Sequence, residues 1–271
     1  MELAIQAHIE KKEFIEQLLA QGERSPLSLL TMNKDGTPYL RMHRVTYLIG
    51  MLGLNELVHI HTGEELHESN RAFKFGLKII SHMDLLSKQL SKKYNMRFVL
   101  EQTPAESTAY RFARLDLKYH SPDAQNYVKG DIERGEAYYT NSTYFAVSSK
   151  MSPIDRVVKE GLFHPRIEAG SLTHIWLGET KPSKESLANF VIKTFRESLN
   201  DQIAFSPEFT NCLGCGKTSR GLKDNCTYCG SDQVEGITRI TGYFTKVSSW
   251  NKGKRGELND RFKNQGYFAT C

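Results

Sequence analysis

The chain has 271 residues, of which 39% are hydrophobic and 25% charged, and its formal net charge is +5. These values are ordinary for a soluble globular protein, and no apolar run is long enough to predict a membrane span. The N-terminus lacks the basic and apolar regions of a signal peptide, so we expect a cytoplasmic protein. The positive charge is modest and spread along the chain, which does not predict direct binding to nucleic acid.

Apolar periodicity predicts three long helices, at about residues 2–20, 65–94 and 184–199. Gly22 follows the first helix and is a plausible stop signal. Ser183 precedes the third helix and is expected to be its N-cap. Phe190 and Phe195 would lie on the inward face of that helix.

Short apolar runs at residues 97–100, 144–147 and 173–177 predict buried strands. His59 and His61 alternate with apolar residues in the manner of a strand, and we expect both to lie at the surface or to be lightly buried. Strands that alternate with long helices predict an α/β fold with a largely parallel sheet.

The composition changes after Phe205-Ser206-Pro207, where Cys, Gly, Asn, Lys and Arg become frequent. We therefore expect a main unit at residues 1–205 and a smaller one at residues 206–271. All five cysteines lie after residue 211. The last of them, Cys271, is either a tail thiol that carries reducing equivalents or an incidental exposed thiol.

The other four cysteines form two pairs, Cys212-x-x-Cys215 and Cys226-x-x-Cys229, with ten residues between the pairs. Thiolates at this spacing can close a tetrahedral zinc site with four cysteine ligands, which has no open position and is structural. Disulfides or reactive thiols are the alternatives, although a reducing compartment favours metal ligation.

Thr103-Pro104-Ala105-Glu106 follows a predicted strand and opens a predicted helix. As structure it is a capping box, with Thr103 as N-cap and Glu106 at the third helical position. The same helix start could also bind a phosphate, because its N–H groups are free and the helix dipole is positive there.

Gly242 lies in the pentad Arg239-Ile240-Thr241-Gly242-Tyr243, after the cysteine pairs. A glycine at this position could simply fill a tight turn. Alternatively it could store an unpaired electron, because an α-carbon without a side chain can flatten and delocalise the electron over both flanking amides.

Several ordered blocks resemble the C-terminal part of the anaerobic, class III ribonucleoside-triphosphate reductases, a family of glycyl radical enzymes. The resemblance covers nearly the whole chain. Its blocks are Ile49–Glu56, Glu101–Arg111, Tyr138–Ser142, the four paired cysteines, Arg239–Tyr243 and Asn251–Lys254.

The resemblance implies that residues 1–205 form the C-terminal half of a ten-stranded α/β barrel and residues 206–271 a zinc ribbon followed by a glycyl radical loop. Gly242 would store the radical, which a separate radical-SAM activase installs. The radical would pass to a cysteine as a thiyl radical, which attacks the 3′ C–H bond of a ribonucleotide to begin its reduction to a deoxyribonucleotide for DNA synthesis.

The resemblance also implies substrate contacts. Ala105, Ser107 and Thr108 would bind the triphosphate of a ribonucleoside triphosphate through backbone and hydroxyl groups. Tyr139 and Asn141 would lie close to the active face of the barrel, although a simple turn after Tyr138 is an equal alternative.

No cysteine precedes Cys212, so the thiyl cysteine would have to come from a separate N-terminal part of the enzyme. This would arise from a natural split or from truncation, and we expect a homodimer of the assembled enzyme. A spare-part protein that donates only a glycyl loop is one alternative. A zinc-ribbon module that binds nucleic acid is another, with a weak basic and aromatic face formed by Lys246, Trp250, Lys252, Lys254 and Arg255.

Overall fold

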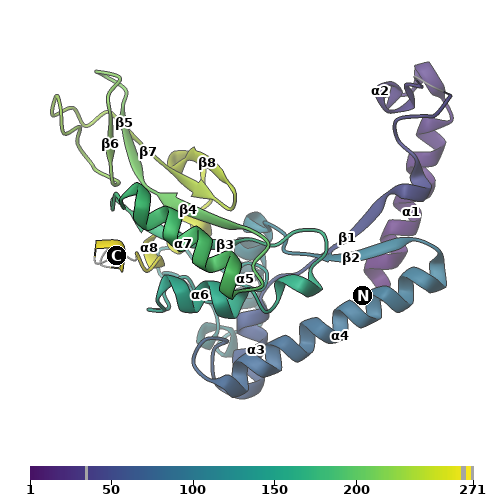
Figure 1. Ribbon diagram of the computed structural model, residues 1–271, viewed down its shortest axis with the longest axis horizontal. Helices are drawn as coiled ribbons and strands as arrows, with labels where there is room; N and C mark the ends of the chain where they lie inside the picture. Colours follow the sequence, from purple (N-terminus) through teal and green to yellow (C-terminus); the bar gives the residue numbers. More distant parts are fainter. Residues whose placement is uncertain (34–35, 264–266, 270–271) are drawn as a thin grey trace.

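The computed structural model describes residues 1–33, 36–263 and 267–269; Cys271 lies outside the described residues. The chain is elongated, with α1 and α2 at one end and a four-stranded sheet at the other (Figure 1). Within the described ranges, no helix is long and apolar enough to cross a membrane.

In the N-terminal part, two parallel strands pair with each other and pack against a long helix. Its elements are α1 (Glu2–Leu19), α2 (Ser28–Thr31), β1 (Thr46–Gly50), α3 (Leu54–Thr62), α4 (Asn70–Tyr94) and β2 (Arg97–Glu101). β1 and β2 run parallel, and α4 packs its apolar stripe against them. This parallel pairing agrees with the predicted α/β class.

A second parallel pair follows, and an antiparallel sheet completes the fold (Figure 1). The elements are α5 (Glu106–Tyr119), α6 (Pro153–Glu160), β3 (Thr173–Gly178), α7 (Lys184–Glu197), β4 (Ile203–Pro207), β5 (Phe209–Cys212), β6 (Thr218–Arg220), β7 (Val234–Ile240), β8 (Tyr243–Lys246) and α8 (Lys252–Asp260). β3 pairs with β4, and the antiparallel sheet has the order β6-β5-β7-β8. The described strands therefore form three separate sheets, and the prediction of one largely parallel sheet is wrong. Short 3-10 turns lie at Gly22–Arg24, Met42–Arg44, Asp123–Asn126, His164–Arg166, Val247–Ser249 and Tyr267–Ala269.

The three predicted helices are present, with differences at their ends. The helix expected from residue 65 begins at Asn70, because Ser69 is its N-cap and the Ser69 hydroxyl accepts a hydrogen bond from the Ala72 N–H. Ser183 caps α7 as predicted, through the Ser186 N–H. Phe195 was expected to face inward, but it is 49% exposed.

The strands expected at residues 97–100 and 173–177 are confirmed as β2 and β3. The prediction of a strand at residues 144–147 is wrong, because this run is buried but irregular. His59 and His61 do not belong to a strand but to α3, which lies between the left-handed residues Gly53 and Gly63. As expected, His59 is only half-buried and His61 is exposed.

β4 (Ile203–Pro207) runs through the predicted boundary at residues 205 and 206. The Thr238 hydroxyl in β7 donates a hydrogen bond to the Pro207 carbonyl at 3.0 Å. A separate apolar cluster, which includes Ile175 and Phe190, packs around β3, β4 and α7. The division into residues 1–205 and 206–271 stays a prediction.

Candidate active site

β7 and β8 form a hairpin whose loop contains Thr241 and Gly242. The register pairs Ile240 with Tyr243, so these two residues alone make the turn. Thr241 has a φ of +49°, in the left-handed region that disfavours β-branched residues. Gly242 is half-buried, and a Cβ built on it would meet no heavy atom within 4 Å beyond its chain neighbours. The predicted radical carrier therefore lies at the tip of the hairpin with open space beside its α-carbon.

The start of α5 differs from the predicted capping box. The helix begins at Glu106 with Ala105 as N-cap, and no side chain within this segment caps it. The Thr103 hydroxyl donates to Glu101 Oε2 at 2.8 Å. Asn141 Oδ1, from a distant segment, accepts the Ala105 N–H at 3.2 Å. A tertiary contact thus replaces the local cap that the sequence predicts.

The predicted substrate residues are partly brought together. Ala105 and Asn141 are hydrogen-bonded to each other, so the Ala105 N–H is already engaged. Ser107 is exposed and Thr108 half-buried, and within residues 1–33, 36–263 and 267–269 neither their N–H groups nor their hydroxyls have a hydrogen-bond partner. The Tyr139 hydroxyl donates to Asp116 Oδ2 at 2.8 Å, further along α5.

Glu56 in α3 anchors the buried segment that carries Asn141. Its Oε1 accepts the Thr140 N–H at 3.2 Å and the Thr140 hydroxyl at 2.5 Å. The Gly53 N–H donates to the Thr140 carbonyl at 3.1 Å. Burial raises the pKa of Glu56 above its usual range, against the lowering effect of these hydrogen bonds.

A second buried acid, Glu160 in α6, holds the other end of this segment. Glu160 Oε1 accepts the Phe145 N–H at 3.3 Å and forms an ion pair with Arg156 at 2.9 Å. Arg156 also donates to the Ala146 carbonyl at 3.3 Å. These side chains satisfy backbone groups that strand pairing would otherwise satisfy, which explains why the predicted strand is absent.

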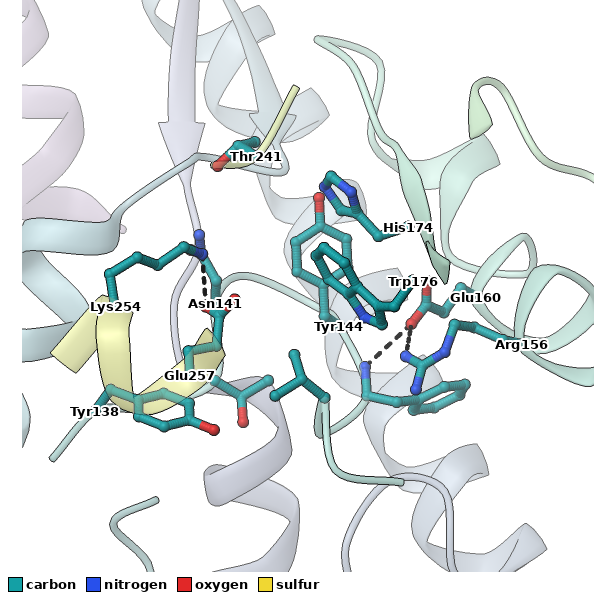
Figure 2. A pocket seen from close by; sticks show the side chains of 13 residues that line it. Tyr138, Asn141, Tyr144, Arg156, Glu160, His174, Trp176, Thr241, Lys254 and Glu257 are labelled. Atoms are coloured by element: carbon teal, nitrogen blue, oxygen red, sulfur yellow. Dashed lines mark hydrogen bonds and ion pairs between the residues drawn. The ribbon is translucent and has the colours of Figure 1, made fainter. Parts of the chain in front are cut away.

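A small cavity of about 20 Å³, enough for about one water molecule, lies between the segment of residues 138–147, β3 and α8. Figure 2 shows Asn141, Tyr144 and Lys254 around this space, with Thr241 and His174 at one side. Burial and the nearby cations lower the pKa of His174 to about 3, so its imidazole is neutral at neutral pH. The turn that carries Gly242 therefore borders, through Thr241, a small cavity lined by both aromatic and polar side chains.

A buried charge network lies beneath the hairpin. Glu257 accepts hydrogen bonds from Lys254 Nζ at 2.6 Å and from Arg261 Nη2 at 3.1 Å. The Arg261 guanidinium lies 4.0 Å from the ring centre of Trp176 and 5.4 Å from that of Trp250. Burial raises the pKa of Glu257, but the two cations outweigh burial and lower it to about 2. Glu257 is therefore ionised at neutral and at mildly acidic pH.

Glu257→Gln is expected to destabilise the fold by about 3–5 kcal/mol, because two buried cations lose their anion. Because the pKa of Glu257 is lowered in the folded state, its contribution is present above pH 4.5 and is lost as the pH falls towards 2. Urea unfolding at neutral and acidic pH would measure both effects. Glu197→Gln, which breaks an exposed ion pair with Lys193, should cost less than about 1 kcal/mol. Equal costs for the two variants would contradict the role of the network.

The four paired cysteines form one cluster, in which all four sulfurs lie within 4.8 Å of one another. Cys212 and Cys229 Sγ are 3.6 Å apart, and Cys215 and Cys226 Sγ are 3.7 Å apart. Zn–S bonds of about 2.3 Å in a tetrahedron place sulfurs about 3.8 Å apart, so the cluster fits Zn²⁺. The N–H groups of Tyr228 and Cys229 lower the pKa of the Cys226 thiol to about 6, which favours the thiolate that a metal requires.

Sequence reasoning predicted burial for none of the charged residues that support the site, although Glu56 and Lys254 lie in blocks that carry the family resemblance. Glu56, Glu160, Lys254 and Glu257 are all buried, yet charged residues of these types are usually exposed. The one available signal was the helical spacing of Lys254, Glu257 and Arg261, which allows ion pairs on one face. That spacing does not reveal burial, because it is also common on exposed helices.

Comparison with known proteins places these features in a family. A family model for anaerobic ribonucleoside-triphosphate reductase matches residues 1–263. The anaerobic ribonucleoside-triphosphate reductase of Enterobacteria phage T4 is 26% identical over 232 residues, which cover 82% of this chain and 35% of that protein. The protein of the same name from Escherichia coli (strain K12) is 24% identical over 255 residues, covering 88% of this chain and 33% of the relative. The chain therefore spans about a third of the length of these curated relatives.

Solved structures share the fold. A structure of an anaerobic ribonucleotide reductase superposes with a TM-score of 0.74 at 20% identity and covers 94% of this chain and 38% of its own. The anaerobic ribonucleotide reductase from Thermotoga maritima with glycerol in the active site gives a TM-score of 0.67 at 19% identity, over 91% of this chain and 37% of its own. The mixed α/β class and the four-cysteine cluster are thereby confirmed.

Proposed function

The chain belongs to the anaerobic ribonucleoside-triphosphate reductase family, and from this premise we propose that it is the C-terminal catalytic portion of such a reductase. The observation that carries the proposal is that three segments expected to belong to the active site lie together. The Gly242 turn, the start of α5 and Asn141 meet at one place, through contacts of Thr241 with Glu106 and of Ala105 with Asn141. These segments are distant in sequence, and each was expected to belong to the active site.

In this proposal a separate radical-SAM activase removes a hydrogen atom from the Gly242 α-carbon. The glycyl radical then takes a hydrogen atom from a cysteine thiol, which restores glycine and leaves a thiyl radical. The thiyl radical removes the 3′ hydrogen of the ribonucleotide. Replacement of the 2′ hydroxyl by hydrogen consumes two electrons and two protons and releases water. The cysteine then returns its hydrogen atom to C3′, and an external reductant such as formate or a small redox protein supplies the electrons.

The thiyl cysteine has to come from another part of the enzyme, because residues 1–211 contain no cysteine. We propose that an N-terminal part supplies it and completes the ten-stranded barrel, of which residues 1–205 form the C-terminal half. The open space beside Gly242 is consistent with a neighbouring segment that approaches the turn in the assembled enzyme. We further propose that the assembled enzyme is a cytoplasmic homodimer.

The proposed substrate is a ribonucleoside triphosphate whose phosphates bind at the first turn of α5. The N–H groups and hydroxyls of Ser107 and Thr108 are available for this role, and a helix N-terminus favours anions. The Ala105 N–H contributes only if the substrate displaces Asn141. Tyr139 supports the first turn of α5 from the side, since its N–H donates to the Ala109 carbonyl.

Zn²⁺ is proposed to be structural. Cys212, Cys215, Cys226 and Cys229 would hold it in a closed tetrahedral site. The ion would fix the loops that join β5 to β7, and β7 leads directly into the Gly242 turn. The zinc site therefore supports the radical loop without contacting substrate.

The alternatives account for less of the chain. A nucleic-acid-binding face that includes Trp250 and Lys254 is disfavoured, because both residues are buried, with 4% and 5% exposure. A spare-part protein requires only a glycyl loop and a small docking body. Here the structural similarity extends over 94% of the chain.

Anaerobic electron paramagnetic resonance tests the proposal. The chain would be mixed with the N-terminal part, a radical-SAM activase and a reductant. We expect a doublet near the free-electron position, which collapses when the glycines are deuterated at the α-carbon. The absence of this doublet, with zinc bound and the activase active on another glycyl radical enzyme, would contradict radical storage by this chain.

A further inference from the structure

The turn that carries Gly242 adopts a conformation that its sequence does not favour. Thr241 occupies the left-handed region with a φ of +49°, where glycine and asparagine are the usual residues of a two-residue hairpin loop. The branched Cβ of threonine makes this conformation costly. Other contacts must therefore hold the turn in place.

Two contacts hold the turn. The Arg239 guanidinium, 4.3 Å from the ring centre of Phe244, donates to the Gly242 carbonyl within the hairpin. The Thr241 hydroxyl donates to Glu106 Oε1 in α5, which is 135 positions away in the sequence. Arg239 also donates to the Phe205 carbonyl at 3.0 Å, and its own carbonyl accepts from Arg261 at 3.2 Å. The Glu106 contact ties the turn to the start of α5.

Glu106 also contacts the segment that follows β8. Asn251 Nδ2 donates to the Glu106 carbonyl at 3.4 Å, while Asn251 Oδ1 caps α8 through the Lys254 N–H at 2.8 Å. The hairpin and α8 are therefore both attached to the first residue of α5. A shift at the start of α5 would be transmitted to both segments.

The position of the Glu106 carboxyl group also affects the first turn of α5. An acidic side chain at the start of a helix is attracted to the free N–H groups of that turn. Here the carboxyl group is engaged by Thr241, and the Ser107 and Thr108 N–H groups have no partner among the described residues. The Thr241 hydroxyl thus engages one oxygen of a carboxyl group that would otherwise be free to interact with those N–H groups.

We infer that Glu106 is a positioning residue that links the radical turn to the phosphate site through its hydrogen bond with Thr241. We call this pair the Glu106–Thr241 latch. The inference rests on the proposed function and deepens it. The closed latch holds Gly242 in place and leaves the first turn of α5 free for phosphate. The open latch loosens the turn and lets the Glu106 carboxylate compete with phosphate.

Amide hydrogen exchange on the zinc-loaded full chain tests the first half of this inference. Thr241→Val removes the hydroxyl and keeps the shape, so exchange within residues 240–244 should become about tenfold faster. Glu106→Ala should have the same effect. Thr241→Ser and Glu106→Gln each keep a hydrogen-bonding group and should restore slow exchange. Exchange in α7 serves as the internal reference for intact folding. Unchanged exchange in both Thr241→Val and Glu106→Ala would overturn the latch.

Calorimetric titration with inorganic triphosphate tests the second half. Thr241→Val frees the carboxylate and should weaken triphosphate binding by about fivefold, which is the effect of one nearby like charge. Glu106→Ala removes the carboxylate and should bind triphosphate at least as tightly as the native chain. A merely structural role predicts the same direction for both variants. The same direction for both, or no triphosphate binding by the native chain, would overturn the inference.

These measurements need neither the activase nor the N-terminal part. A native enzyme that forms no radical would therefore refute the proposed function without deciding the latch. Conversely, unchanged hydrogen exchange in the variants would refute the latch and leave radical storage by Gly242 intact.

Discussion

Gly242→Ala is expected to abolish the organic radical while the fold and the zinc content stay unchanged. The φ of Gly242 lies outside the left-handed region, and an added Cβ meets no heavy atom within 4 Å, so alanine fits without strain. The methyl group nevertheless hinders the planar arrangement that delocalises the electron over both amides. Electron paramagnetic resonance would show no doublet, and thermal unfolding would show a native transition.

A matched glycine substitution controls for this result. Gly214 also has an ordinary φ, and a Cβ there would meet the Ser231 hydroxyl at 3.6 Å and Cys212 Sγ at 3.7 Å, both ordinary contacts that leave the cluster intact. Gly214→Ala should therefore keep the radical. A doublet that persists in Gly242→Ala, or reductase activity that stays complete with partner and activase, would show that another residue stores the radical.

Cys226→Ser is expected to release zinc and unfold the loops around the cluster. Cys226 is buried, and its thiolate is one of the four ligands that the cluster offers. The apparent binding free energy of a structural zinc site is about 10–16 kcal/mol, which is lost as folding free energy when the site fails. The zinc content found by metal analysis should fall from about one zinc per chain to far less, and hydrogen exchange should become faster across residues 209–238.

The same substitution should lower the radical yield, because β7 begins after the cluster and leads into the Gly242 turn. Cys271→Ser is the matched control, since it removes the one cysteine outside the two pairs. It should retain zinc. If Cys226→Ser still carried one zinc per chain, Cys226 would not be a required ligand.

Local signals in the sequence predicted much of the fold. Ser183 caps α7 through a residue three positions away, and the apolar stripe of α4 packs on β1 and β2 as its period indicates. The Cys-x-x-Cys spacing predicted the four-cysteine cluster, because each pair lies within a single turn. These features depend on neighbours within a few residues, which a single sequence displays directly.

Other features depended on contacts between distant residues. Asn141 caps α5 from 36 positions away, so Thr103 does not act as the cap that the local pattern predicts. Glu56 lies 84 positions from Thr140, whose backbone it binds, and such a contact leaves no periodic signal. The irregular run at residues 144–147 resembled a strand because apolar content reveals burial but not which groups satisfy the backbone.

The sequence by itself determined the α/β class, the four-cysteine cluster and the resemblance that singled out Gly242. Only the tertiary structure decided that Thr241 contacts Glu106 and that Lys254, Glu257 and Arg261 are buried beneath the hairpin. The physical reason is that burial and long-range hydrogen bonds arise when separate elements pack together. A buried charge and an exposed one look the same in a sequence, and their environments differ only after folding.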